Sequence, residues 1–193
     1  MSANALTLAS DAAPAETSMS ALAAGDDAAL CAAYRAHHAH VRAFARRLVG
    51  SDDEAEDLVH EVFSHLPRAA RRFRGESSLR TLLVGMAINL ARHPVRAAAR
   101  RRAAGIRLAR EPRTAAQQPA DPVERRQLAE ALVRALDTLP LEQRVAFVLC
   151  EVEERTSAEA GALARTNDGT MRARLMAARQ KLRAQLRAWG YGT

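Results

Sequence analysis

The sequence predicts an all-α protein made of two small helical domains joined by a flexible linker. Of its 193 residues 48% are hydrophobic, but only 4% are aromatic, and 9 Gly and 7 Pro leave a composition rich in alanine, leucine and arginine. That composition favours helices. Apolar residues recur at spacings of three and four along several segments, which is the helical period, and no segment alternates convincingly with the strand period of two.

Four segments differ in composition. Residues 1–25 contain no basic residue and no helical stripe, which predicts a disordered N-terminal tail. Residues 26–98 form the first helical domain. Residues 99–122 hold clustered arginine followed by glutamine, proline and aspartate, which is typical of a flexible linker. Residues 123–189 form the second helical domain.

The first domain is expected to contain three main helices. An apolar stripe runs along residues 30–48, with members three or four positions apart. A second helix follows Ser51, which can cap it, and acidic residues in its first turn favour the helix dipole. A third helix opens near Ser77 or Ser78, and Pro94 is expected to end or bend it.

The second domain carries the most informative pattern. Apolar stripes over 128–139 and 145–152 predict two helices. A short helix capped by Thr156, a turn over 167–170 and a helix over 171–186 then follow. Two short helices joined by a glycine-containing turn are the pattern of a DNA-binding helix-turn-helix. The same pattern also fits a plain helical hairpin with a solvated basic face.

Charge is separated into blocks along the chain. Residues 51–66 carry six acidic residues and no arginine or lysine, while 67–113 carry thirteen arginines against two glutamates, and 155–193 carry eight basic residues against two acidic ones. The whole chain has a net charge of +7 and a pI of about 10.7. This balance favours a polyanionic partner, nucleic acid first and a membrane surface second.

The last predicted helix has the residue types of a DNA-reading helix. Arginine can pair with guanine edges and glutamine with adenine edges, and small residues between them let a helix approach the major groove. The residues expected on this face are Thr170, Arg172, Ala173, Met176, Ala177 and Gln180. Flanking residues suited to phosphate contacts are Arg174, Arg179, Lys181 and Arg183.

No group of residues predicts catalysis, a metal or a cofactor. Asp57, His60 and Glu61 could suggest a metal or acid–base cluster, but no second histidine lies four positions from His60, and a solvated acidic face is the simpler interpretation. Cys31 and Cys150 lie too far apart in sequence for a metal knuckle. We therefore expect a non-enzyme in a reducing cytoplasm, and the absence of a long apolar run predicts no membrane insertion.

Four motifs occur in one order along the chain. They are AEDLVHEVF at 55–63, FRGESSLRT at 73–81, AINLA at 87–91, and an interrupted pattern from Leu139 to Leu182 that begins with Leu-Pro and includes GTMRARL. Over about residues 27–188 the chain resembles the extracytoplasmic-function (ECF) sigma factors, which are promoter-specificity subunits of bacterial RNA polymerase.

The resemblance implies a division of labour between the domains. The first, region 2, would bind the clamp of core RNA polymerase and open the −10 promoter element, and the second, region 4, would read the −35 element. An anti-sigma factor would be a further partner. By position, the polymerase-binding residues are Glu56, Asp57, Glu61 and Phe63, and the −10 residues are Arg80, Thr81, Asn89 and Arg96. The −35 residues are Thr170, Arg172, Ala173 and Arg174, with Arg179 further along the same helix.

The chain departs from the family's pattern at several positions. Leu82 stands where an aromatic residue is usual, Gly85 where a basic residue is frequent, and Glu154 and Arg165 where glycine is frequent. Two alternatives follow. One is a degenerate sigma-like protein that binds polymerase or an anti-sigma factor without efficient promoter opening, and the other is a free-standing helix-turn-helix regulator.

Overall fold

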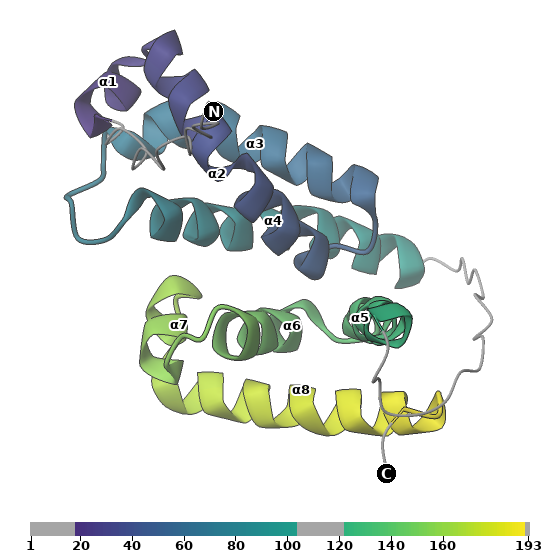
Figure 1. Cartoon of the computed structure of the whole chain (residues 1–193). Coiled ribbons are helices and arrows are strands. Elements are labelled where there is room, and N and C mark those ends of the chain that lie inside the picture. The colour runs from purple at the N-terminus through teal and green to yellow at the C-terminus, as the bar shows by residue number, and fades with distance from the viewer. Residues whose placement is uncertain (1–17, 104–121, 192–193) are drawn as a thin grey trace, which may run out of the picture.

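The computed structural model describes residues 18–103 and 122–191, and for 93–103 and 122–127 it gives the backbone alone. The described residues form two helical bundles and contain no strand (Figure 1). The predicted all-α class is confirmed. In chain order the elements are α1 (Met19–Ala24), α2 (Asp27–Leu48), α3 (Asp52–Ala70), α4 (Leu79–Ala103), α5 (Pro122–Asp137), α6 (Leu141–Phe147), the π-helical turn η1 (Val148–Val152), α7 (Ser157–Leu163) and α8 (Asp168–Ala188).

The first bundle consists of α1 to α4, with α3 in contact with the other three helices. The Ser51 hydroxyl accepts a hydrogen bond from the Glu54 backbone N–H at 3.2 Å, so the predicted cap of α3 is present. The apolar stripes of α2, α3 and α4 meet in the centre of the bundle. Fully buried residues there include Val41, Phe44, Leu48, Val59, Val62, Leu66, Leu83 and Ile88.

Helix α1 is a short element that the sequence did not predict. Leu22 is fully buried against the bundle, and Gly25 ends the helix with a left-handed φ of 80°. The Arg71 side chain donates a hydrogen bond to the Ala23 carbonyl at 2.9 Å, which ties α1 to the end of α3. The prediction of a disordered tail over 1–25 is therefore wrong for residues 19–24, and residues 1–17 lie outside the described part of the chain.

Helix α4 is longer than predicted. It passes Pro94 and continues to Ala103, so the helix does not end at the proline. The residues after Pro94 are mostly alanine and arginine, which are strong helix formers and offset the hydrogen bond that proline cannot donate. The backbone of 99–103 thus belongs to α4 rather than to the predicted linker, most of which, 104–121, is outside the described residues.

The second bundle consists of α5 to α8, and α8 packs across α5, α6 and α7 (Figure 1). Its core includes Leu136, Val145, Leu149, Met171, Ala178 and Leu182. The link from α7 to α8 is compact: a Cβ added at Gly161 would lie 2.9 Å from the Thr166 carbonyl oxygen, so only glycine fits without a shift. Glu154 and Arg165 both have a φ of 53°, the left-handed region that glycine adopts most easily.

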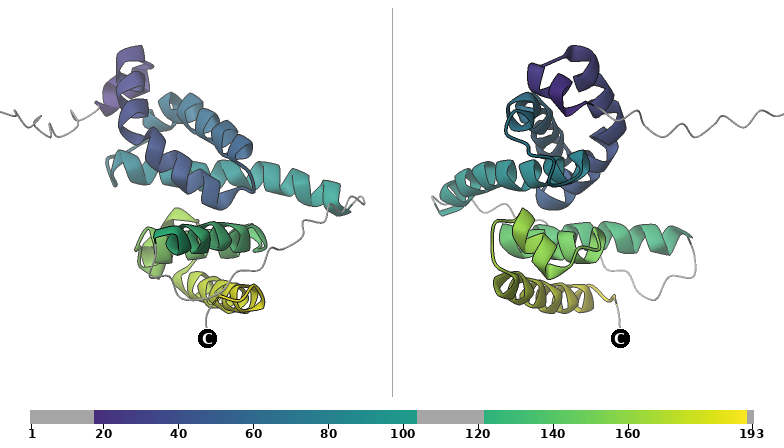
Figure 2. Two further views of the ribbon diagram at one scale, coloured as in Figure 1. Left: turned by 45° about the vertical axis from the view of Figure 1, so that its right-hand side comes forward. Right: turned by 90° about the vertical axis from the view of Figure 1, so that its left-hand side faces the viewer.

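The two bundles pack against each other. Helices α5 and α6 contact α2, and α6 and α7 contact α4, while α8 lies on the side of the second bundle away from the first (Figures 1 and 2). The side chain of Arg144 in α6 is only 9% exposed and donates a hydrogen bond to the Leu48 carbonyl at the end of α2, at 2.8 Å. The first bundle therefore faces the inner side of the second and leaves α8 open.

Candidate nucleic-acid interface

The helix pair α7 and α8 is built from local sequence signals. Thr156 and Glu159 form a capping box at the start of α7. The Glu159 carboxylate accepts one hydrogen bond from the Thr156 backbone N–H and one from its hydroxyl. Both lower the pKa of the Glu159 carboxyl, and the backbone hydrogen bond has the larger effect. Asn167 caps α8 by accepting a hydrogen bond from the Thr170 N–H at 2.7 Å. These caps fix the angle at which α8 leaves the turn, as a helix-turn-helix requires.

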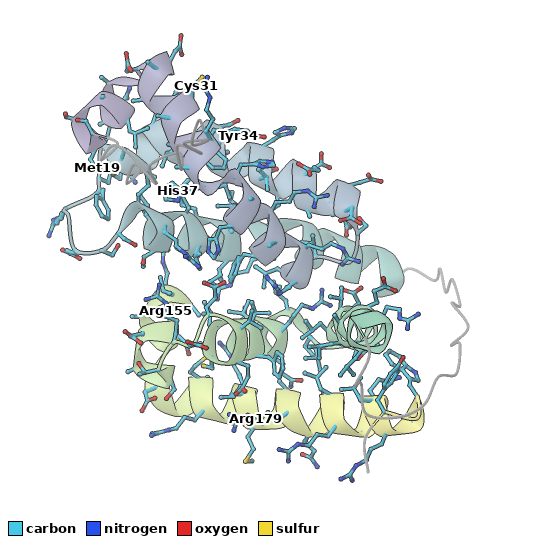
Figure 3. The ribbon with its side chains drawn as sticks, in the orientation of Figure 1. Met19, Cys31, Tyr34, His37, Arg155 and Arg179 are labelled. Carbon is cyan, nitrogen blue, oxygen red and sulfur yellow. The ribbon has the colours of Figure 1, made fainter. Side chains whose placement is uncertain are left out.

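The outer side of α8 is a solvent-exposed basic face. The side chain of Arg172 is 67% exposed and that of Arg179 50%, and Met176 is 71% exposed between them. Figure 3 places Arg179 on this outermost helix. We call this surface the α8 face. It borders an open hollow of about 510 Å³ lined by Met176, Arg179, Gln180, Arg183, Ala184 and Arg187.

The sequence-predicted −35 residues do not all lie on the α8 face. Arg172, held 3.0 Å from Asp168, and Ala173 are exposed there, and Thr170 is half-buried at the start of the helix. Arg179 binds Glu151, with its Nε at 3.0 Å from the carboxylate. Arg174 lies on the inner side instead, 2.8 Å from the carboxylate of Glu142 in α6.

The predicted polymerase-binding residues share one region of α3. Asp57 and Glu61 are exposed, whereas the carboxylate of Glu56 is hydrogen-bonded by Arg42 of α2, which lowers the pKa of that carboxyl. Phe63 packs edge-on against Tyr34, with ring centroids 4.9 Å apart. An apolar hollow of about 360 Å³ lies beside this pair, lined by Leu30, Cys31, Tyr34, Arg35, His60, Phe63 and Ser64.

The predicted −10 residues lie along the start and middle of α4, where Arg80 is exposed and Thr81 and Asn89 are half-buried. Arg80, Thr81 and Asn89 come from this helix, and Arg96 lies in its part for which only the backbone is described. Thr81 and Asn89 line a cavity of about 630 Å³ together with Phe73 from the loop before α4. The opposite wall comes from the second bundle: Ala162, Leu163 and Arg165.

Sequence reasoning missed the residues that join this surface to the second bundle. Arg92 of α4 binds the Glu142 carboxylate through Nε at 3.0 Å and Nη2 at 3.3 Å. Arg80 lies 3.4 Å from Glu153, which follows η1. Charge blocks of opposite sign, acidic around 123–154 and basic around 67–113, were the only signal in the sequence, and they do not say which residues pair.

Comparison with known protein families matches both domains. The model of sigma-70 region 2 matches residues 33–101, and the model of sigma-70 region 4 matches residues 129–182. The ECF RNA polymerase sigma factor SigE of Mycolicibacterium smegmatis is 33% identical over 176 residues. The chain belongs to the ECF group of sigma-70 factors.

Another relative in this group shares less sequence identity with this chain. The ECF sigma factor SigM of Mycobacterium tuberculosis is 26% identical over 164 residues, covering 85% of this chain and 80% of SigM. The match to SigE covers 85% of this chain but only 65% of SigE, so this ECF chain spans about two thirds of that relative's length. In the described ranges no helix of this ECF chain is long and apolar enough to cross a bilayer.

Solved structures show the same fold. The sigma factor RpoE of Bartonella quintana, solved in complex with the anti-sigma factor NepR, aligns with a TM-score of 0.61 and 23% identity over 80% of this chain and 94% of that one. CnrH, solved in complex with the cytosolic domain of CnrY, aligns with a TM-score of 0.60 and 21% identity over 88% of this chain and 95% of that one. The bundles α1–α4 and α5–α8 thus correspond to a sigma fold.

Proposed function

We propose that this chain is a sigma factor that binds core RNA polymerase and directs promoter-specific initiation through the −10 and −35 elements. The observation that carries the proposal is the exposed basic α8 face, presented by a capped helix-turn-helix in a chain whose other bundle matches sigma-70 region 2. A sigma factor has no catalytic step of its own. Its contribution is binding energy, which offsets the cost of unstacking and opening the promoter.

The α8 face reads duplex DNA in this proposal. A helix in the major groove contacts base edges through residues near its N-terminus, where Arg172 and Ala173 are exposed. Arg179 and Arg183 lie further along the same face and contact phosphates, which position the helix without reading sequence. Arg174, turned inward to Glu142, is assigned no base contact while this ion pair persists.

The acidic side of α3 docks on the polymerase clamp. Asp57 and Glu61 are exposed and can meet a basic partner surface, which steers association and fixes orientation. The apolar hollow beside Phe63 and Tyr34 supplies a site for an apolar anchor from the partner. An anti-sigma factor is a second partner of this chain in our proposal, since the structural neighbours RpoE and CnrH were solved with protein partners.

Region 2 captures the opened −10 strand at the cavity beside α4. Phe73 offers a ring on which an extruded base can stack, in place of the aromatic residue that Leu82 replaces. Thr81 and Asn89 offer hydrogen-bonding groups at the same cavity. The side chain of Arg80 is 52% exposed and can supply positive charge for the DNA backbone. We place the protein in the cytoplasm, where these partners are found.

Run-off transcription with purified core polymerase tests the proposal. Core polymerase is mixed with this chain and a pool of genomic fragments, and transcripts are compared with those of core polymerase alone. We expect discrete promoter-specific transcripts. The absence of any such transcript would refute the proposed activity. Glu61→Lys should weaken core binding and transcription, whereas the same charge change at the exposed Glu154 should have little effect.

A second measurement separates base reading from phosphate contacts on α8. Arg172→Ala should cost about 1–3 kcal/mol on the preferred −35 sequence and relax specificity at one base pair. Arg187→Ala, at the C-terminal end of the same face, should weaken binding evenly across sequences and reduce its salt dependence. Specific binding of the free chain to a palindrome, without polymerase, would instead favour a free-standing regulator.

A further inference from the structure

We propose that the cavity between the loop before α4 and the turn after α7 binds a free nucleoside polyphosphate, with the base stacked on Phe73 and the phosphates held by Arg72, Arg74 and Arg165. The inference rests on the proposed function in one respect, because the same ring would stack an extruded −10 base. It adds a small-molecule ligand that competes with the promoter strand for this ring.

The cavity lies where the two bundles meet at one end of the molecule. One wall consists of the loop between α3 and α4 with the neighbouring side of α4, and the other consists of α7 and the turn after it. Figure 1 shows this loop and α7 at the same end of their bundles. The volume of about 630 Å³ lies within the range of about 300–1,000 Å³ that small-molecule sites occupy. A single nucleotide is a ligand of suitable size.

Three arginines line this cavity without an acidic partner. Arg72 and Arg74 lie on the loop and Arg165 on the turn, and in the part of the chain that the structure describes no carboxylate pairs with them. Arg80 of α4, by contrast, lies 3.4 Å from a glutamate carboxylate. The lining contains one acid, Glu76, so positive charge is in excess there. Guanidinium groups that are not paired with acids can bind phosphate oxygens through two-point contacts.

Arg165 occupies its place at a conformational cost. Its φ of 53° is in the left-handed region, which is strained for a residue that has a side chain. The side chain is exposed and makes no hydrogen bond or ion pair within the described ranges, so no such contact offsets the strain. Backbone strain of this kind is concentrated at sites that hold a ligand. A bound phosphate would give the side chain of Arg165 the partner that it lacks.

Phe73 supplies a flat apolar surface beside these charges. It is half-buried just after the end of α3, and among the residues described its ring stacks on no other ring. Stacking of a base on an aromatic ring is favourable for every base, because each base has a π-face. Thr81 and Asn89 add polar side chains to the same lining. A ring next to cations that have no acidic partner matches a molecule that joins a planar base to a chain of phosphates.

Isothermal titration calorimetry of the full chain with ATP in metal-free buffer tests the site. We expect saturable binding of ATP to a single class of site. Adenosine and inorganic tripolyphosphate should each bind more weakly, because each reaches only part of the site. No detectable binding of ATP at millimolar concentration would refute the proposal. Binding of tripolyphosphate as tightly as ATP would also contradict it, because the site would then recognise charge without a base.

Replacing Arg165 with glycine separates ligand binding from stability. Arg165→Gly should relieve the strained φ and raise the Tm, but it should weaken ATP binding by about fivefold. Glu154→Gly relieves the same φ of 53° at a residue outside the cavity lining, so it should raise the Tm without weakening ATP binding. Arg183→Gln removes one positive charge from α8 and should leave ATP binding nearly unchanged. Equal weakening by Arg183→Gln and Arg165→Gly would reduce the effect to net charge and overturn the proposal.

Substitutions of Phe73 test the stacking. Phe73→Leu keeps an apolar side chain but removes the ring, so ATP binding should weaken by about tenfold. Phe73→Tyr keeps the ring and should bind ATP like the native chain. Circular dichroism shows that each variant is folded, and the Arg165→Gly measurement stands if Phe73→Leu is not. Unchanged ATP binding in a folded Phe73→Leu would contradict the placement of the base on this ring.

A fluorescein-labelled single strand of DNA distinguishes a free nucleotide from a nucleotide within a strand. Arg165→Gly should weaken the binding of ATP more than that of the strand, because a strand has many phosphates that other arginines can bind. An equal or larger loss for the strand would assign the site to DNA and overturn the proposal.

Run-off transcription keeps this proposal separate from the proposed function. Promoter-specific transcripts from a chain that binds no ATP would refute the nucleotide site alone. ATP binding that depends on Arg165 and Phe73, in a chain that yields no transcript with core polymerase, would refute the proposed function and leave the nucleotide site intact.

Discussion

Replacing Arg144 with methionine should destabilise the protein substantially. The side chain of Arg144 is 9% exposed, and its hydrogen bonds include those to the Leu48 carbonyl at 2.8 Å, to the Leu139 carbonyl at 3.2 Å and to the Asp137 carboxylate at 3.3 Å. Methionine retains much of the apolar stem but no donor. The two carbonyls and the carboxylate then lose a charged partner in a largely dry site.

The size of the loss follows from these three contacts. A hydrogen bond to a charged group contributes about 1.5–3 kcal/mol, but removing the guanidinium also removes the cost of burying it. Asp137 is 27% exposed, so water can partly replace its lost partner. We therefore expect the free energy of unfolding to fall by about 3 kcal/mol, which corresponds to roughly 6–12 °C in Tm for a chain of this size.

Thermal and urea unfolding followed by circular dichroism measure this loss. Arg183→Met, at an exposed position of α8, removes the same charge from the surface and serves as the control. We expect the control to stay within about 0.5 kcal/mol of the native protein. If Arg144→Met changes stability no more than the control does, the buried hydrogen bonds do not stabilise the protein as argued.

Three further predictions concern stability. Arg165→Gly should raise the free energy of unfolding by about 0.5–1 kcal/mol in urea titrations, since glycine adopts a φ of 53° without strain. Leu22→Ala should lower it by about 3 kcal/mol, and no loss would mean that α1 does not dock. Burial above all lowers the pKa of His37 and His40 from the usual 6.5, so neutral imidazole is favoured in the folded state. Their contribution to stability is then complete above pH 6.5 and declines as the pH falls below it. The urea midpoint should therefore drop between about pH 7.5 and about pH 5.5. The drop in the midpoint should be smaller in His40→Gln than in the native protein.

Local signals made much of the fold predictable. Ser51, Thr156 and Asn167 were each followed by an apolar helical period, and each caps a helix in the structure. A cap and a stripe act within one or two turns, so their effect can be read without knowing the tertiary structure. The outward position of Arg172 follows from the same period, because the buried residues of α8 define the opposite side.

Contacts between distant segments could not be predicted in this way. Leu22 holds α1 only because α3 offers it a buried site, and a six-residue helix has no stable form alone. Arg174 was assigned to DNA by its position in a motif, but Glu142, thirty-two positions earlier, turns it inward. The contact between the two bundles depends on such pairs, and sequence charge blocks show only that opposite signs exist.

Permanganate footprinting of a promoter bound by core polymerase and this chain tests the central claim most directly. Permanganate oxidises unpaired thymines, so it reports strand opening rather than binding. We expect reactive thymines just upstream of the transcription start with the native chain and none with core polymerase alone. Stable binding of the chain to polymerase and promoter without any reactive thymine would contradict the account and favour a sigma-like protein that does not open DNA.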